Sequence, residues 1–225
     1  MKNSMLTYIT GQSEILRDPL VITPNTEYIC VTDNKRIKSK VWKVVYDSNI
    51  AKSSLSYRDR TAAIKFNPFK YTTGSRVIIV DGSHQQYADA TFAFDACENT
   101  GLLLKNHPQK VNAYEELFRW IIGRNLPSEQ AIRFRTLASV AKVDLSAIKI
   151  YEGCCIGVIR SPSIQKLFTS VLSVLQKCGS DNIWFMSNQI TLSFLVHLLK
   201  VPHETFVPST IFNRYTHNGW VKNNE

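Results

Sequence analysis

Residues 77 to 80 form the most constraining feature of this sequence, a run of four branched apolar residues (Val-Ile-Ile-Val) that ends directly at Asp81. Branched side chains favour a strand, and an unbroken apolar run is typical of a strand buried on both faces of a mainly parallel sheet. Gly82 then allows a sharp turn. The pattern therefore predicts a central strand that delivers a carboxylate to its own exit.

Other segments extend this pattern into an α/β fold. Further β-type runs precede the strand at Met5 to Thr10, Tyr28 to Thr32 and Val41 to Tyr46, and helical periodicity follows over residues 113–122, 128–142, 162–178 and 187–199. Ser161 and Pro162 suit the start of a helix, and Gly123 is placed to end one as a left-handed cap. We expect a central, mainly parallel sheet flanked by helices.

Length and composition predict one soluble domain. A chain of 225 residues with 44% hydrophobic residues can bury about 70% of its unfolded surface. No apolar run reaches the ~20 residues that cross a bilayer, and the N-terminus lacks the apolar stretch of a signal peptide. The cysteines at positions 30, 97, 154, 155 and 178 suit neither a disulfide framework nor a zinc knuckle. We expect buried thiols in a cytoplasmic protein.

The net charge of +9 is compatible with nucleic acid, an anionic membrane surface or phosphorylated small molecules. Two clusters carry much of the excess, one at residues 35–40 and one at residues 58–70. Neither is the continuous basic block of a nucleic-acid-binding arm. Ordinary solubilising charge is the remaining alternative.

Asp33 and Asp81 both stand at the ends of predicted strands, where ligand sites form in α/β sheets. Mg²⁺ and Mn²⁺ prefer oxygen ligands and often take one or two carboxylates, with substrate phosphates and water completing the shell. An Asp-Gly pair after a strand is also a common turn. From these residues alone, a metal site and a plain turn both remain open.

Segments in a fixed order along the chain resemble a known glycosyltransferase family. They are Thr7 to Gly11, Val31 to Asn34, Trp42, Arg58 to Lys65, Asn67 to Tyr71, Ile79 to Ser83, Asn106 to Pro108, Tyr114 to Glu116, Glu152-Gly153, Ile159-Arg160, Trp184 and Ser187 to Gln189. The family includes the majastridin-like proteins and a large group of related domains long described as of unknown function. The resemblance spans nearly the whole chain and rests on order and spacing rather than on one decisive motif.

This resemblance implies a single-domain GT-A-like (Rossmann-like) nucleotide-diphospho-sugar transferase fold over residues 1–225. The nucleotide-binding half would span about residues 1–105 and the acceptor-side half about 106–225. The implied activity is metal-dependent transfer of a sugar, favoured as a UDP-sugar, to a hydroxyl on a surface glycan, lipopolysaccharide or lipid-linked glycan. Such a role in polysaccharide biosynthesis implies the cytoplasm or the inner face of the membrane, which the basic surface would contact.

The resemblance also implies a donor site. The expected cofactor-binding residues are Thr10, Gly11, Asp33, Arg58, Arg60, Lys65, Asn67 and Ser83. Arginine would grip the diphosphate with two hydrogen bonds and lysine would act as a point charge, although a solvated helix face is an alternative. Asp81 matches the first acid of the family's Asp-x-Asp motif for Mn²⁺ or Mg²⁺. Ser83 replaces the second acid, and we expect His217 to complete the metal shell.

The catalytic base is less well defined. The family's Asp-Gln pair is Asn188-Gln189 in this chain, and an amide cannot accept a proton. Asp181 and Glu152 are the alternative carboxylates, with Gln189 beside them, and His107 would face the acceptor. Without a placed carboxylate, the leaving diphosphate would assist the acceptor hydroxyl, so inversion and retention both remain open.

Two other function classes remain open. A nucleic-acid-binding module is suggested by Tyr57, Phe66, Phe69 and Tyr71, which lie among basic residues as stacking platforms do, and a sugar transferase acting on DNA would combine both activities. A degenerate transferase fold that binds sugar nucleotides without turnover is suggested by Ser83 and Asn188.

Overall fold

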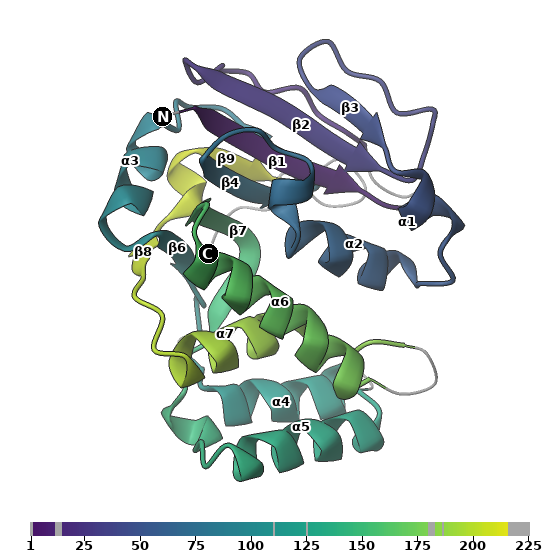
Figure 1. Ribbon diagram of the computed structural model, residues 1–225, viewed down its shortest axis with the longest axis vertical. Coiled ribbons are helices and arrows are strands. Elements are labelled where there is room, and N and C mark those ends of the chain that lie inside the picture. Colours follow the sequence, from purple (N-terminus) through teal and green to yellow (C-terminus); the bar gives the residue numbers. More distant parts are fainter. Residues whose placement is uncertain are drawn as a thin grey trace.

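The computed structural model describes residues 2–11, 15–109, 111–124, 126–179, 183–185 and 187–215. A seven-stranded sheet with the order β3-β2-β1-β4-β7-β6-β8 lies at its centre, and a two-stranded ribbon pairs β5 with β9 (Figure 1). The strands are β1 (Asn3–Ile9), β2 (Thr26–Thr32), β3 (Lys43–Tyr46), β4 (Arg76–Asp81), β5 (His84–Gln86), β6 (Leu102–Asn106), β7 (Tyr151–Ile159), β8 (Glu204–Phe206) and β9 (Phe212–Arg214).

Helices connect and cover these strands. They are α1 (Ser48–Lys52), α2 (Tyr57–Lys65), α3 (Thr91–Thr100), α4 (Ala113–Gly123), α5 (Ser128–Val140), α6 (Pro162–Lys177) and α7 (Asn188–Leu198). Short 3₁₀ turns occur at η1 (Pro68–Lys70), η2 (Leu145–Ala147) and η3 (Pro208–Thr210). No helix in the described part of the chain is long and apolar enough to cross a membrane.

The strand predicted from the branched run is the middle strand of the sheet. β4 pairs in parallel with β1 and antiparallel with β7. All four side chains from Val77 to Val80 are at most 2% exposed. β1, β2 and β3 are parallel to one another, and β6 is parallel to β8. The prediction of a buried central strand in a mainly parallel sheet is therefore confirmed.

The two faces of the sheet support two separate hydrophobic clusters. Alternation along β1 sends Leu6 and Tyr8 into one cluster and Met5 and Ile9 into the other. The larger cluster includes buried residues of α2, α4, α5, α6 and α7, and the smaller one includes α3 and β9. Figure 1 shows α4, α5, α6 and α7 stacked together on one side of the molecule. The result is a layered α/β fold.

The structure confirms the predicted start of α6 but not the predicted end of α4. Ser161 caps α6 by accepting a hydrogen bond from the Ile164 backbone N–H at 3.3 Å, and Pro162 lies in the first turn, as predicted. The predicted left-handed cap at Gly123 is wrong. Gly123 belongs to α4 and has no positive φ, because the backbone N–H groups of Arg124 and Leu126 both reach the Trp120 carbonyl.

All five cysteines are buried thiols, as the sequence predicted. Burial raises the pKa of Cys30 and of Cys97 to about 12, so both remain protonated at neutral pH. They act as small apolar side chains in the cluster that packs against α3.

Candidate active site

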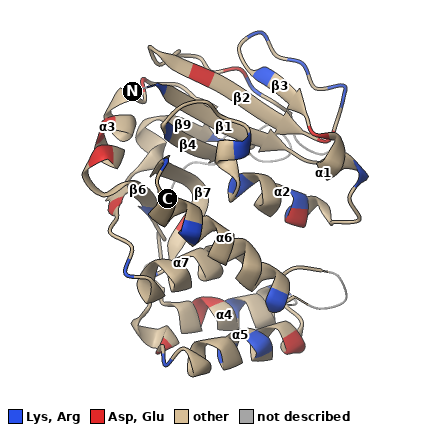
Figure 2. Ribbon diagram, in the orientation of Figure 1, with Lys and Arg blue, Asp and Glu red and all other residues tan. Residues whose placement is uncertain are grey.

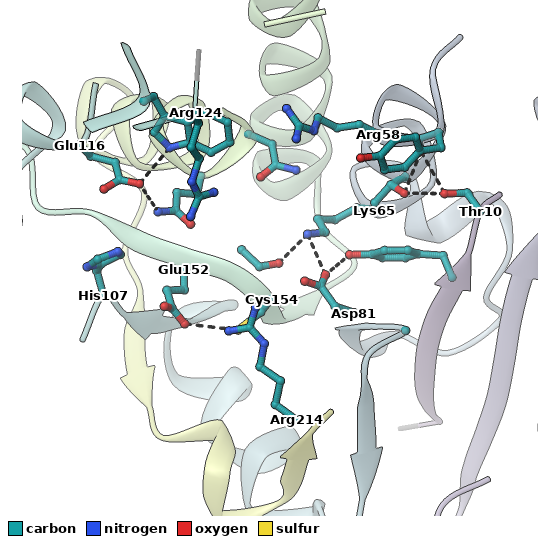
Figure 3. A pocket seen from close by; sticks show the side chains of 18 of the residues that line it. Thr10, Arg58, Lys65, Asp81, His107, Glu116, Arg124, Glu152, Cys154 and Arg214 are labelled. Carbon is teal, nitrogen blue, oxygen red and sulfur yellow. Dashed lines mark hydrogen bonds and ion pairs between the residues drawn. The ribbon is translucent and has the colours of Figure 1, made fainter. Parts of the chain in front are cut away.

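A cavity of about 560 Å³ opens at the carboxyl ends of β1 and β4, between α2 and α4. Ligand sites form at this edge of α/β sheets. Its walls come from Tyr8, Thr10, Tyr57, Arg58, Thr61, Lys65, Asp81, Gly82, His107, Gln109, Glu116, Arg119, Trp120, Arg124, Glu152, Gly153, Cys154, Asn188, Gln189 and Arg214. Figure 3 shows the side chains from α2, α4 and β9 converging on it. The exit of β4 therefore leads into a pocket and does not end in a plain surface turn.

Asp81 lines this pocket with its side chain 31% exposed. Its Oδ1 atom lies 2.9 Å from the Lys65 ammonium and also accepts a hydrogen bond from the Tyr8 hydroxyl (Figure 3). The Lys65 side chain is 4% exposed, and its Nζ also donates to the Gly153 carbonyl at 2.7 Å. The ammonium further lies 5.4 Å from the centre of the Tyr8 ring, within cation–π range. β1, β4, β7 and α2 thus meet at this charge pair.

Thr10 and Arg58, two of the residues predicted to bind the donor, also line the pocket. The Thr10 hydroxyl donates to the Tyr57 carbonyl at 2.9 Å and lies 2.8 Å from the Thr61 hydroxyl. The Arg58 guanidinium lies 5.6 Å from the ring centre of Trp120, which belongs to α4 on the other side of the pocket. Thr10 therefore fixes α2 to the end of β1, and Arg58 spans toward α4.

Asp33, Gly11 and Arg60 form a separate cluster outside the pocket lining. The backbone N–H of Gly11, at a φ of +76°, donates to Asp33 Oδ1 at 3.0 Å. Arg60 pairs with Asp33 Oδ2 at 2.9 Å and donates to the carbonyls of Ser53 and Leu55. These contacts occupy Arg60, which was predicted to grip a diphosphate, and Asp33, which was predicted to bind the nucleotide. They hold the chain at the ends of β1 and β2 to α2.

Two further predicted donor residues also lie outside the lining. Asn67 is exposed at the start of η1, where its carbonyl accepts from Lys70. The Ser83 hydroxyl lies 3.3 Å from His84 Nδ1 on β5. Burial lowers the pKa of His84 to about 4 although the Asp81 carboxylate acts in the opposite direction, so this imidazole is neutral at pH 7.

A polar cluster on α4 and α7 forms the other wall. Glu116 is 5% exposed, and its Oε1 accepts from Trp120 Nε1 at 2.9 Å and from the Gln189 amide at 3.0 Å. Gln189, predicted near the reacting centre, therefore faces a carboxylate. Asn112 and Glu115 form a capping box that starts α4. Because Glu115 serves that cap, the next residue, Glu116, turns toward the pocket.

Glu152 lines the floor of the pocket from β7. Its side chain is 15% exposed and forms an ion pair with Lys105 of β6. Figure 3 shows Arg214 of β9 pointing toward it. Burial and the nearby Asp81 carboxylate raise the pKa of Cys154 to about 12, so the neighbouring thiol is protonated. Glu152 is therefore a carboxylate that reaches the cavity, whereas Cys154 is not a thiolate nucleophile.

Of the two predicted metal ligands, Asp81 and His217, only Asp81 lies within the described residues. No group of three or more His, Cys, Asp or Glu side chains within them could hold a metal ion. Asp81 Oδ1 already accepts from an ammonium and a hydroxyl, and Ser83 contacts His84. His217, the other predicted ligand, and Asp181, a predicted base, lie outside the described residues. The metal ligands therefore stay a prediction.

The aromatic residues considered as stacking platforms have other roles in the fold. Phe66 is 3% exposed and packs edge to face against Phe168. Tyr71 donates to Asp47 at 2.8 Å, and Phe69 lies beneath the Arg160 guanidinium. Tyr57, at 64% exposed, borders the pocket. Because Phe66 is in the core, these four rings cannot form a continuous surface for nucleobases.

Positive charge exceeds negative charge around the pocket. The lining contains five Lys or Arg residues against three carboxylates. Figure 2 shows two separate groups of Lys and Arg, one on α2 and one on the connection between β2 and β3. Sequence reasoning missed Arg119, Arg124 and Arg214, because isolated arginines on a helix or in a late strand carry no local signal. The one available signal was the spacing of Glu116 and Trp120, which places both side chains on the same face of α4.

A second hollow, of about 520 Å³, lies between β7 and α7. Lys149, His197, Lys200 and His203 are among its lining residues. The His203 Nε2 atom lies 2.6 Å from the Tyr151 hydroxyl, and Nδ1 lies 3.1 Å from the Val201 carbonyl. An N–H on Nδ1 would donate to that carbonyl, which leaves Nε2 to accept from tyrosine.

Comparison with known proteins supports the fold. No family model matches the chain, and no curated protein sequence matches it, so the resemblance to majastridin-like proteins stays a prediction. The crystal structure of mouse xyloside xylosyltransferase 1 in its apo form matches with a TM-score of 0.51 and 9% sequence identity, over 93% of this chain and 86% of that one. The predicted single-domain, GT-A-like α/β fold, with its mainly parallel sheet, is therefore confirmed as the fold of this protein.

Proposed function

We propose that this protein is a glycosyltransferase that binds a nucleotide sugar in the pocket at Asp81 and transfers the sugar to an acceptor hydroxyl. The observation that carries the proposal is the surplus of cations around a cavity at the carboxyl ends of β1 and β4, in a fold shared with a xylosyltransferase. Each phosphate of a sugar-linked diphosphate carries one negative charge. Five basic side chains facing three carboxylates suit such a ligand.

The donor diphosphate would lie toward α2, where Arg58 and Lys65 line the cavity. Arg124, which directly follows α4, lies 4.5 Å from the Trp120 ring centre, so one aromatic ring contacts both Arg58 and Arg124. Planar guanidinium groups bind phosphate oxygens with two hydrogen bonds. Since negative charge grows on the diphosphate as it leaves, these cations stabilise the transition state more than the ground state.

The acceptor would enter on the side of Glu116, Glu152 and Gln189. In the transfer, an acceptor oxygen forms a bond to the anomeric carbon while the bond from that carbon to the diphosphate oxygen breaks. The bonding electrons leave with the diphosphate, and the hydroxyl proton passes to Glu152. Glu116 and Gln189 would hold acceptor hydroxyl groups, because a carboxylate accepts hydrogen bonds from a glycan and an amide both accepts and donates them.

A thermal-shift panel of sugar nucleotides tests this function. UDP-, GDP- and CDP-linked sugars should include at least one that raises Tm, because a ligand that binds the folded state stabilises it. Arg58→Glu should abolish the shift, whereas Arg36→Glu, an exposed arginine outside the pocket, should retain it. If no sugar nucleotide shifts Tm, or if Arg58→Glu responds like the wild type, the function is not this one.

A further inference from the structure

The Lys65 ammonium occupies the position beside Asp81 where a metal-dependent transferase would need its cation. Lys65 Nζ lies 2.9 Å from Asp81 Oδ1, and the Tyr8 hydroxyl donates to the same oxygen. A divalent ion approaching this carboxylate would meet an ammonium that is 4% exposed and cannot swing into solvent without losing its contact with Gly153. A divalent ion and the Lys65 ammonium, both bound to one carboxylate, would repel each other strongly in this partly buried site.

The surrounding chain holds the ammonium in place. Gly153 brings its carbonyl oxygen to 2.7 Å from Nζ, and a side chain at position 153 would begin 3.6 Å from Nζ. The Tyr8 ring lies 5.4 Å away on another side. Contacts with Asp81 and Gly153 use two of the three N–H donors of an ammonium. The remaining donor is the one from which a phosphate oxygen can accept.

The geometry points to Lys65 as the cation that binds the donor diphosphate, so that the nucleotide binds without a divalent metal. This inference rests on the proposed function and specifies how the donor is held. Lys65 provides a fixed positive charge at Asp81, and the arginines from α2 and α4 complete the neutralisation. Asp81 orients the ammonium and is not itself a ligand of the nucleotide. Removal of the Asp81 charge should therefore not weaken nucleotide binding, whereas it would do so if Asp81 held a metal ion.

Calorimetric titration of UDP, GDP and CDP, with EDTA or with millimolar Mn²⁺, tests the inference. We expect the Kd of the nucleotide that binds to differ by less than about threefold between the two conditions. Lys65→Met should weaken binding in EDTA by about 30-fold or more, and Asp81→Asn should bind at least as tightly as the wild type. Lys70→Met, which removes a lysine–aspartate pair outside the pocket, should bind normally.

The outcomes separate the two proposals. Binding that needs Mn²⁺, or that Asp81→Asn abolishes, overturns the role of Lys65 but leaves a nucleotide-binding transferase intact. If UDP, GDP and CDP all fail to bind in either condition, both proposals fail. Should Lys65→Met not fold, as judged by its circular dichroism spectrum, the comparison of EDTA with Mn²⁺ in the wild type and in Asp81→Asn still decides between an ammonium and a metal.

Discussion

The Lys65 ammonium lies 2.9 Å from Asp81 Oδ1 and 2.7 Å from the Gly153 carbonyl oxygen, so that one side chain of α2 joins the ends of β4 and β7. These two strands are antiparallel neighbours at the centre of the sheet. The carboxylate at the exit of β4 is therefore balanced by a buried cation in the folded protein. This pair connects the stability of the sheet to the electrostatics of the pocket.

Asp81→Asn should destabilise the fold only moderately. The substitution leaves Lys65 without its carboxylate partner, but the ammonium keeps the Gly153 carbonyl and the Asp81 side chain is 31% exposed. Solvent screening reduces the value of such a pair, and we expect a loss of about 1–2 kcal/mol in the free energy of unfolding. Urea denaturation measures it. A loss as large as that of a fully buried broken pair, about 3–5 kcal/mol, would show that the pair is sealed from solvent.

Protonation of His84 should lower the free energy of unfolding as the pH falls from 6.5 to 4. Burial lowers the pKa of His84 from 6.5 to about 4, so the unfolded chain binds a proton in this window that the folded protein does not. Stability contributed by the neutral ring is complete above the unfolded pKa of 6.5 and declines as pH falls, by about 3 kcal/mol in total. Urea melts across this range measure the slope, which His84→Gln should flatten. An unchanged slope in the variant would contradict the assignment.

A second loss of stability is expected below pH 4.5. Burial would raise the pKa of Asp47, but hydrogen bonds from Lys70, Tyr71 and the Ile50 backbone outweigh it and lower the value to about 2. A carboxyl group with a lowered folded pKa stabilises the protein above its unfolded pKa, near 4, and loses that contribution as pH falls toward 2. Asp47→Asn should remove part of this acid-dependent loss in denaturation experiments. It should leave the slope between pH 6.5 and pH 5 unchanged, which separates it from His84.

Gly157→Ala should disrupt the contact between β7 and α3. A Cβ atom at this position would lie 2.5 Å from Cys97 Sγ, closer than real contacts, and 3.0 Å from Leu103 Cβ, which is also tight. Overpacking of this kind costs about 1–3 kcal/mol. Gly123→Ala is the matched control, because it lies in α4 with nothing within 4 Å, and it should stabilise by about 0.5–1 kcal/mol. Thermal unfolding of both variants checks the signs. If Gly157→Ala left the stability unchanged, α3 would pack more loosely against β7 than the structure shows.

Glu152→Gln should lower kcat and leave donor binding nearly unchanged. The substitution keeps the shape of the side chain but removes the oxygen that would take the acceptor proton, which costs about 100-fold or more in general base catalysis. The readout is transfer to a glycan acceptor, together with the Kd of the nucleotide. Glu129→Gln, an exposed residue of α5, is the control. Equal losses of kcat and nucleotide affinity would place Glu152 in donor binding and not in proton transfer.

The sequence predicted the central strand and the long helices because their patterns are local. A branched apolar run and a capped amphipathic helix are visible in neighbouring residues, as in β4 and α6. β7 was missed because Gly153 and Gly157 interrupt its apolar pattern. The structure shows why glycine is needed at position 157, where a Cβ atom would lie 2.5 Å from Cys97 Sγ of α3. α3 was missed as well, because no side chain caps its start at Ala90.

The site was predicted in part for a similar reason. Asp81 stands at a strand exit, and that position follows from sequence. Its pairing with Lys65, and the diversion of Arg60 to Asp33, depend on how α2 packs across the sheet. Tertiary contacts between distant segments leave no signal in the neighbouring residues of the sequence. Donor sugar, acceptor and a location in the cytoplasm or at a membrane stay predictions.

A crystal structure of the protein with bound UDP or GDP would show where the diphosphate lies relative to Lys65. We expect the diphosphate in the cavity between α2 and α4, with a phosphate oxygen about 3 Å from Lys65 Nζ, the distance of a charge-assisted hydrogen bond. A nucleotide bound instead in the hollow beside Lys149 and His203, or with its diphosphate remote from Lys65, would show that Lys65 does not bind the donor.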